Sequence, residues 1–415
     1  MIEFFIWFIV IGISTELVMF ATITYVNKKF QWLIIDRDER PKIIPNALKK
    51  FIDHGYDPEL GWVRKPNTSH LENGKYGQTK WSIDSSSARD NPGFGELESK
   101  ISCYGDSFAF CRQVNDNETW EHFLSKMLDT NVKNFGVGNY GLDQALLRLK
   151  REYEKNRTQF VIMAVVPDTI SRILSVWKHY YEYGNTFGFK PRFELNNGEL
   201  IIFENPINDK DKFLNYEKFL EDIKIHDYFY INKFIKEKIH FPYSFSIFRN
   251  PLRNFLIIFW VLVFEILKKS KKDNSSIQWK PMEIIMKINL RWRIKLYSYK
   301  FATQLLKKII EEYVRYARTE NSIPILVFIP QKDDVLFVRN NYHFYENTIK
   351  EIKEMTGIYI IDILDYFLSE TDIDHLYSDD NNYGGHLSIE GNMKVATILC
   401  QKLIEQYRGT LSIKG

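Results

Sequence analysis

Five short apolar runs, each next to a stretch with helical spacing, constrain this chain more than any other feature of its sequence. The third run reads Phe-Val-Ile-Met-Ala-Val-Val and is apolar at every position, which is typical of a strand buried on both faces of a parallel sheet. The alternation predicts an α/β fold with a doubly wound, mostly parallel, five-stranded sheet. The predicted strands are Ile101–Tyr104, Val132–Phe135, Phe160–Val166, Ile323–Ile329 and Ile358–Ile363, and the predicted helices include Thr119–Leu128, Leu142–Tyr153 and Ser388–Tyr407.

A long segment separates the third predicted strand from the fourth. It begins with a predicted hairpin, in which Asn196-Asn197-Gly198 joins Phe189–Leu195 to Glu199–Phe203. The helices that follow include Asn254–Leu267, which is apolar on nearly every face and lies in a region rich in Lys and Arg. This helix is short for a membrane span. Two interpretations stay open: contact with an anionic membrane surface, or a lid helix packed on the protein.

The amino-terminal segment from Ile2 to Val26 is almost continuously apolar. About 20–25 helical residues cross a bilayer, and the segment has neither a basic start nor a small-residue cleavage site. We therefore predict a retained single-pass transmembrane anchor. Lys28 and Lys29 follow it, and the positive-inside rule then favours a cytoplasmic location for the rest of the chain. The predicted division is an anchor at 1–29, a linker and extension at 30–98, the first half of the main domain at 99–172, an insertion at 173–320 and the second half at 321–415.

Composition excludes some classes of function. The net charge of +3 over 415 residues does not indicate a nucleic-acid-binding protein. The three cysteines, Cys103, Cys111 and Cys400, have no metal-ligand spacing and are too few for a disulfide framework. We therefore expect buried thiols, no metal and no organic cofactor.

The first predicted strand ends in Gly105-Asp106-Ser107. Gly permits a tight turn there, which would place the Ser107 hydroxyl at the carboxyl edge of the sheet, where α/β folds carry their active sites. A Ser hydroxyl becomes a nucleophile when a base, usually His, takes its proton. His386 lies in a Gly-rich loop before the last helix, and the predicted fold would bring it to the same edge. A helix cap is the simpler interpretation of Gly-Asp-Ser taken alone.

Three sequence blocks together resemble the SGNH (GDSL) hydrolases. They are Gly105–Phe108 with Glu118-Thr119-Trp120, then Asn134–Gln144, and finally Gly385–Asn392. The resemblance covers roughly residues 56–170 and 320–407 and implies a flavodoxin-like SGNH fold. It also implies that Ser107 is the nucleophile and His386 the base, and that the N–H groups of Ser107, Gly138 and Asn139 bind the oxyanion. Members of this family often work outside the cytoplasmic membrane, so the side of the membrane stays open.

The chain departs from the family pattern at three places. The family has Asn-Asp after the central strand, where this chain has Pro167-Asp168, so one oxyanion donor is missing. Asn139 stands where the second block has a glycine; its backbone N–H can still serve as a donor, and its side chain is a candidate replacement for the missing amide. The family places an Asp three residues before the His, where this chain has Tyr383. Asp379 or Asp380 would then orient His386, and we select Asp380.

The function predicted from these residues is hydrolysis of O-acyl esters, in the first place acetyl esters, of a carbohydrate in a bacterial cell envelope. One alternative is an O-acyltransferase that uses the same Ser-His pair and receives its acyl group from a membrane partner. The other is an inactive binding or assembly module, which the changes at Pro167 and Tyr383 would explain.

Overall fold

The computed structural model describes residues 1–74, 77–268, 275–378 and 385–411. The chain forms two compact units, and each is built from segments that lie far apart in the sequence. The first unit contains Met1–Leu48, Ser175–Phe189 and Asp211–Asn289, and the second contains Lys49–Leu174, Lys190–Lys210 and Leu290–Gly415.

A five-stranded parallel sheet forms the centre of the second unit. Its strands are β5 (Ser99–Gly105), β6 (Asn131–Asn134), β7 (Phe160–Val165), β10 (Ile323–Phe328) and β11 (Tyr359–Asp362). They lie in the order β11-β10-β7-β5-β6, and all neighbours are parallel. In chain order this is 2-1-3-4-5, the order of flavodoxin-like sheets. The five strands predicted from the sequence are therefore confirmed, with small changes at their ends.

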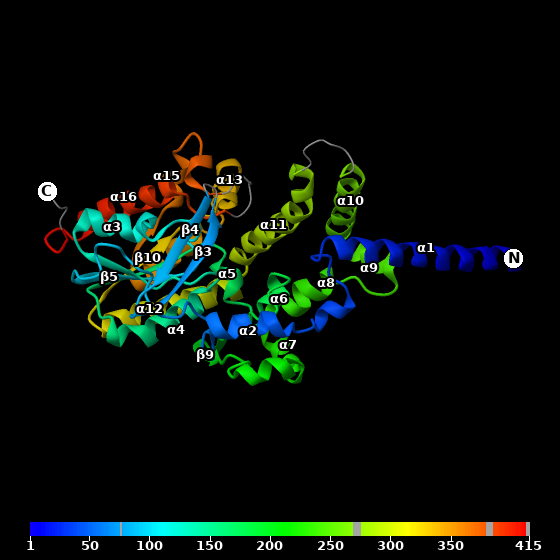
Figure 1. Cartoon of the computed structure of the whole chain (residues 1–415), viewed down its shortest axis with the longest axis horizontal. Helices are drawn as coiled ribbons and strands as arrows, with labels where there is room; N and C mark the ends of the chain where they lie inside the picture. The colour runs from blue at the N-terminus through cyan, green and yellow to red at the C-terminus, as the bar shows by residue number, and fades with distance from the viewer. Residues whose placement is uncertain (75–76, 269–274, 379–384, 412–415) are drawn as a thin grey trace. The chain divides into compact units, whose positions relative to one another are not determined.

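Helices pack on the sheet through amphipathic faces. On α12 (Lys300–Thr319), Leu305, Leu306, Ile309, Ile310 and Tyr313 recur at helical spacing and are all buried. In Figure 1, α3 (Trp120–Leu128) and α16 (Ile389–Gln406) lie on one side of the sheet, and α4 (Leu142–Glu152) and α12 lie on the other. Other helices of the second unit include α5 (Thr169–Arg172), α13 (Lys332–Asn340), α14 (Glu346–Thr356) and α15 (Leu364–Leu368).

Three antiparallel hairpins complete the second unit. They are β1 (Tyr56–Asp57) with β2 (Gly61–Trp62), β3 (Thr68–Gly74) with β4 (Gly77–Ile83), and β8 (Arg192–Asn196) with β9 (Glu199–Phe203). The last is the hairpin predicted from Asn-Gly, and it is confirmed. Asn197 and Gly198 have φ of 50° and 86°, as a two-residue turn between strands of this twist requires.

The structure differs from the sequence interpretation between Arg37 and Asp53, where a linker was expected. A helix, α2 (Pro45–His54), occupies most of this stretch. Pro45 suits the first turn of a helix, and Leu48, Phe51 and Ile52 recur at helical spacing. The apolar positions are too few and the segment too short for its periodicity to stand out in the sequence.

The first unit is helical. Its longest helix, α1 (Ile2–Lys29), packs near its carboxyl end against α9 (Tyr243–Arg249) and α10 (Pro251–Leu267). Within the described residues, α1 is the one helix long and apolar enough to cross a membrane. Its other elements include α6 (Lys178–Tyr181), α7 (Leu220–His226), α8 (Ile235–Glu237) and the start of α11 (Ser275–Tyr297).

A substitution at Gly136, which follows β6, would measure how tightly the second unit is packed. A Cβ on Gly136 would lie 2.3 Å from the Phe110 nitrogen and 2.6 Å from the Ala109 carbonyl carbon, and both are backbone atoms. We expect Gly136→Ala to lower the free energy of unfolding by about 1–3 kcal/mol, the usual cost of overpacking. Gly95→Ala is the matched control, since nothing lies within 4 Å of its Cβ position. Denaturant unfolding in detergent measures both, and equal effects would contradict the close packing.

Candidate functional site

The turn that carries Ser107 begins where β5 ends. A Cβ on Gly105 would lie 1.8 Å from the Ala164 carbonyl oxygen of β7, so only glycine fits this close approach between the strands. Ser107 follows two residues later at the carboxyl edge of the sheet, and only 5% of its surface is exposed. Its backbone and hydroxyl therefore lie in a largely buried turn.

The Asp106 carboxylate holds this turn in place. One oxygen accepts a hydrogen bond from the Phe108 N–H at 2.8 Å, and the other accepts from the Val166 N–H at 3.0 Å and from Arg172 at 3.1 Å. Arg172 also donates to the Tyr140 carbonyl at 3.0 Å. One carboxylate thus connects the end of β5 to the segment after β7, and its arginine partner connects both to the loop after β6.

His386 reaches Ser107 from the opposite end of the domain sequence. The His386 Nε2 and Ser107 Oγ are 2.9 Å apart, so the neutral imidazole can accept the hydroxyl proton. Ser378 holds the His386 backbone: its N–H donates to the His386 carbonyl at 2.8 Å, and its hydroxyl lies 3.0 Å from the same carbonyl oxygen and 2.7 Å from the Gln113 side-chain oxygen. The structure therefore brings together the two residues that the sequence interpretation selected as nucleophile and base.

Burial and neighbouring cations act on the His386 imidazole. Burial first, and then the positive charges of Arg112 and Arg172, lower the pKa of His386 from 6.5 to about 3. The imidazole is therefore neutral at physiological pH. A neutral imidazole is the form that accepts a proton from a serine hydroxyl.

The loop after β6 lies beside Ser107. A Cβ on Gly138 would lie 3.9 Å from the Ser107 Cβ. Trp62 and Tyr140 hold this loop: the Trp62 indole N–H donates to the Gly138 carbonyl at 2.9 Å, and the Tyr140 hydroxyl donates to the Trp62 carbonyl at 2.5 Å. Asn139 is exposed and has φ of 69°, a conformation that Asn tolerates better than most residues.

The N–H groups proposed for the oxyanion are available. In the part of the chain that the structure describes, no acceptor meets the backbone N–H of Ser107, Gly138 or Asn139. Unpaired N–H groups beside a nucleophile are what an oxyanion site needs, because donors already paired with protein groups would have to be released first.

The segment after β7 holds Pro167 where the family pattern has Asn. The Pro167 carbonyl accepts a hydrogen bond from the Tyr297 hydroxyl at 2.9 Å, and the preceding Val166 N–H donates to Asp106. Pro167 therefore directly follows Val166, the residue that contacts the turn carrying Ser107. Asp379, Asp380 and Tyr383 lie outside the described residues.

The sequence interpretation missed the residues that support the site. Asp106 was treated only as part of the Gly-Asp-Ser turn, although it is buried and makes three hydrogen bonds. Arg172 was not selected; its spacing of four residues from Asp168 was the available signal, and the two form an ion pair at 3.3 Å. Nothing in the sequence marked Trp62, because its contact with Gly138 spans two distant segments.

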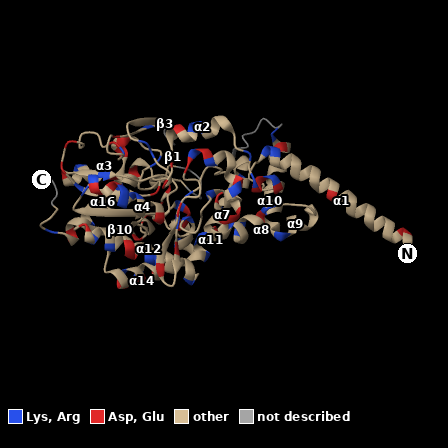
Figure 2. Cartoon of the chain, turned by 90° about the horizontal axis from the view of Figure 1, so that it is seen from below, with Lys and Arg blue, Asp and Glu red and all other residues tan. Residues whose placement is uncertain are grey.

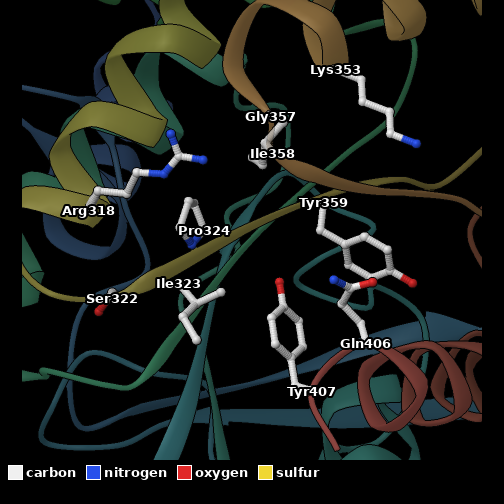
Figure 3. Close-up of a pocket in the computed structure, with 10 residues that line it drawn as sticks. All are labelled: Arg318, Ser322, Ile323, Pro324, Lys353, Gly357, Ile358, Tyr359, Gln406 and Tyr407. Atoms are coloured by element: carbon white, nitrogen blue, oxygen red, sulfur yellow. The ribbon is translucent and has the colours of Figure 1, made fainter.

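A cavity of about 400 Å³ lies at the other edge of the sheet (Figure 3). Ile323 and Tyr359, at the amino ends of β10 and β11, line it together with Arg318 and Lys353. Ser107 follows the carboxyl end of the parallel strand β5, so this cavity is separate from the Ser107–His386 site.

No family model matches the chain, and no curated protein matches it. The solved structures similar to it include a lipolytic protein of the G-D-S-L family from Desulfitobacterium hafniense DCB-2, at 12% identity, with a TM-score of 0.34 over 73% of this chain and 99% of the other. A lipase/acylhydrolase from Enterococcus faecalis is similar at 10% identity, with a TM-score of 0.36 over 76% and 99% of the two chains.

An acetylxylan esterase from Geobacillus stearothermophilus is also similar, at 10% identity, with a TM-score of 0.34 over 76% of this chain and 96% of the other.

The lowered pKa of His386 leads to a direct measurement. Because the folded-state pKa lies below 6.5, His386 stays neutral as pH falls through that value, and acid destabilises the fold because the unfolded chain binds the proton more readily. A ¹⁵N-histidine NMR titration should show a neutral His386 at pH 5, with the signal assigned by its loss in His386→Gln.

Arg112→Gln should raise the pKa of His386, because it removes a positive charge that opposes protonation. Arg315→Gln, which removes a remote guanidinium on α12, is the control and should leave that pKa unchanged. An ordinary pKa near 6.5 in the unmodified protein would contradict the buried, cation-flanked environment.

Proposed function

We propose that this chain is a membrane-bound serine esterase of the SGNH type, with Ser107 as nucleophile and His386 as general base. The observation that carries the proposal is the 2.9 Å contact between His386 Nε2 and Ser107 Oγ. The two residues are 279 positions apart in the chain, and they meet at the sheet edge where α/β enzymes carry their sites.

The acylation step follows from this geometry. The Ser107 oxygen attacks the acyl carbon of the ester, and its proton passes to Nε2 of His386. The tetrahedral intermediate carries a negative charge on the former carbonyl oxygen. The unpaired N–H groups of Ser107, Gly138 and Asn139 are suited to bind that oxygen.

Collapse of this intermediate completes acylation, and the attack of water then begins deacylation. His386 returns its proton to the leaving alkoxide, which departs as an alcohol and leaves the acyl group on Ser107. A water molecule then attacks the acyl carbon, His386 takes the water proton, and the carboxylic acid leaves as Ser107 regains its hydrogen. No metal or organic cofactor takes part in this sequence.

Several features favour an enzyme over an inactive binding module. The imidazole is neutral and already hydrogen-bonded to the hydroxyl, and the Ser107 turn is held by a buried ion pair between Asp106 and Arg172 at 3.1 Å. A chain that had lost catalysis would have no need to keep the neutral base and the unpaired N–H groups together. Some SGNH enzymes work with a Ser-His dyad, so an Asp partner is not a requirement.

The substrate that we propose is an O-acyl ester, in the first place an acetyl ester, of a cell-envelope carbohydrate. The helix α1 supports this choice, since it is long and apolar enough to anchor the protein at a membrane. Asp380 is proposed as the residue that orients His386, by its place in the sequence. We also propose the domain division given above, with residues 173–320 inserted in the SGNH domain.

The first test is the nucleophile itself. Ser107→Ala should abolish p-nitrophenyl acetate hydrolysis and covalent labelling by a fluorophosphonate, because both need the hydroxyl oxygen. The melting temperature should change by only a few degrees, since one hydroxyl is removed from a packed turn. Ser298→Ala, at an exposed serine of the same unit, is the control and should label normally. Labelling that persists in Ser107→Ala would move the nucleophile elsewhere.

Asn139 provides the second test. If its side-chain amide replaces the family's missing Asn, Asn139→Gly should lower kcat by about 10²–10³, the usual effect of one oxyanion donor. Glycine adopts the φ of 69° without strain and keeps the backbone N–H, so the loss isolates the side chain. Pro167→Asn in the Asn139→Gly background should then restore part of the lost rate. An unchanged kcat in Asn139→Gly would leave the oxyanion to the backbone N–H groups alone.

A further inference from the structure

The helices α9 and α10 of the first unit expose large apolar side chains. Phe245, Phe248 and Phe259 are 63%, 61% and 54% exposed, and Leu252 is 68% exposed. The rings of Phe248 and Phe255 are in contact, with centroids 5.3 Å apart, so exposed apolar side chains of α9 and α10 meet. Exposing this many apolar side chains to water costs free energy, which indicates that another molecule covers them.

Glu16 joins this helix pair to α1. The Glu16 carboxylate accepts hydrogen bonds from the Tyr243 N–H at 2.6 Å, from the Ser244 N–H at 3.0 Å and from the Ser244 hydroxyl. These N–H groups belong to the first turn of α9, whose helix dipole also favours a negative charge. The contact thus satisfies both a carboxylate in an apolar helix and the free N–H groups of a helix start.

The position of Glu16 along α1 determines how deep α9 lies. Lys29 lies thirteen positions after Glu16, which is about 20 Å at the rise of an α-helix. Figure 2 shows α1 nearly free of charge along its length, with basic residues at its carboxyl end. If Lys28 and Lys29 lie at the headgroups, Glu16 and the start of α9 lie well inside a hydrocarbon core of about 30 Å.

The ends of α10 lie at the level of the charged end of α1. Near the start of α10, buried Arg253 donates to the Trp32 carbonyl at 2.9 Å, just beyond the carboxyl end of α1. Near the end of α10, Glu265 pairs with Lys29 at 3.0 Å and accepts from Tyr25 at 3.1 Å. Both ends therefore lie at nearly one level along α1, and Figure 1 shows α10 running across α1.

We propose that α9 and α10 form a second membrane-embedded element beside α1, in which α9 enters the hydrocarbon core from one side and returns, and α10 lies along the same interface. The occupant of the exposed apolar surface is lipid. The 110° bend between the two helices fits a segment that enters and leaves through one face. Continuity with α1 favours lipid over a soluble partner, because Ile247, Ile257 and Val261 pack in one core with Ile23 and Val26 of α1. This inference rests on the proposed membrane span of α1.

Lipid contact can be measured on the full-length chain in phosphatidylcholine–phosphatidylglycerol vesicles. Single cysteines at Phe248 and Phe259 are labelled with an environment-sensitive fluorophore, and doxyl lipids serve as quenchers. The three native cysteines are buried and should take up little label. Val10→Cys on α1 reports the anchor, and Leu214→Cys is the matched control, since Leu214 is an equally exposed apolar residue of the same unit.

We expect doxyl lipids to quench the labels at 248 and 259 at least twofold more than the label at 214, and to protect them from aqueous iodide. Glu16→Ala removes the acceptor for the α9 start, so it should reduce lipid quenching at 248 while leaving quenching at position 10 unchanged.

Three outcomes would overturn the inference. Quenching at 10 without quenching at 248 and 259, together with access to iodide, would leave α1 as the anchor and place α9 and α10 in water. Protection of 248 and 259 from both quenchers would mean that a protein surface covers them. Absence of lipid quenching at all four positions would overturn the span of α1 itself, and with it the membrane part of the proposed function.

Discussion

The hydrogen bonds of the Asp106 carboxylate are the interaction on which the rest of the site depends. A buried carboxylate costs several kcal/mol unless its oxygens are paired, and here they accept from two backbone N–H groups and from Arg172. Burial raises the pKa of Asp106, and the Arg172 charge opposes that rise. The pairing requires the segments after β5 and β7 to lie in one relative position. Because Ser107 is the next residue, the same requirement fixes the position of Ser107.

The strand order explains why three distant loops converge there. β5 lies between β6 and β7, so the loops that leave the carboxyl ends of all three strands begin side by side. Arg172 lies in the segment after β7. It donates to the Asp106 carboxylate in the loop after β5 and to the Tyr140 carbonyl in the loop after β6. The last helix, α16, begins just after His386, with Ser388 capping it through the Gly391 N–H at 3.1 Å. Hydrogen bonds in the supporting loops therefore help to place the Ser107–His386 pair.

Glu16 in the first unit is a second carboxylate that is stabilised by hydrogen bonds from backbone N–H groups. It is a carboxylate in an apolar setting, and its cost is offset by two N–H groups and a hydroxyl from the start of α9. Asp106 in the second unit and Glu16 in the first each join segments far apart in the chain. The partners of both carboxylates are mainly backbone N–H donors. Backbone donors of this kind leave no mark on composition or periodicity.

The amino-acid sequence by itself determined the five strands, the Asn-Gly hairpin, the apolar α1 and the choice of Ser107 and His386. These features depend on local chemistry: alternation of apolar runs with helical spacing, a turn type that Asn-Gly adopts, and a motif whose residues are adjacent. Only the tertiary structure decided that Arg172, Trp62 and Ser378 support the site, and that Glu16 binds the start of α9. Each of these contacts joins residues that are many positions apart, and the energy of such a pair depends on distance in space and on burial, which no spacing along the chain records.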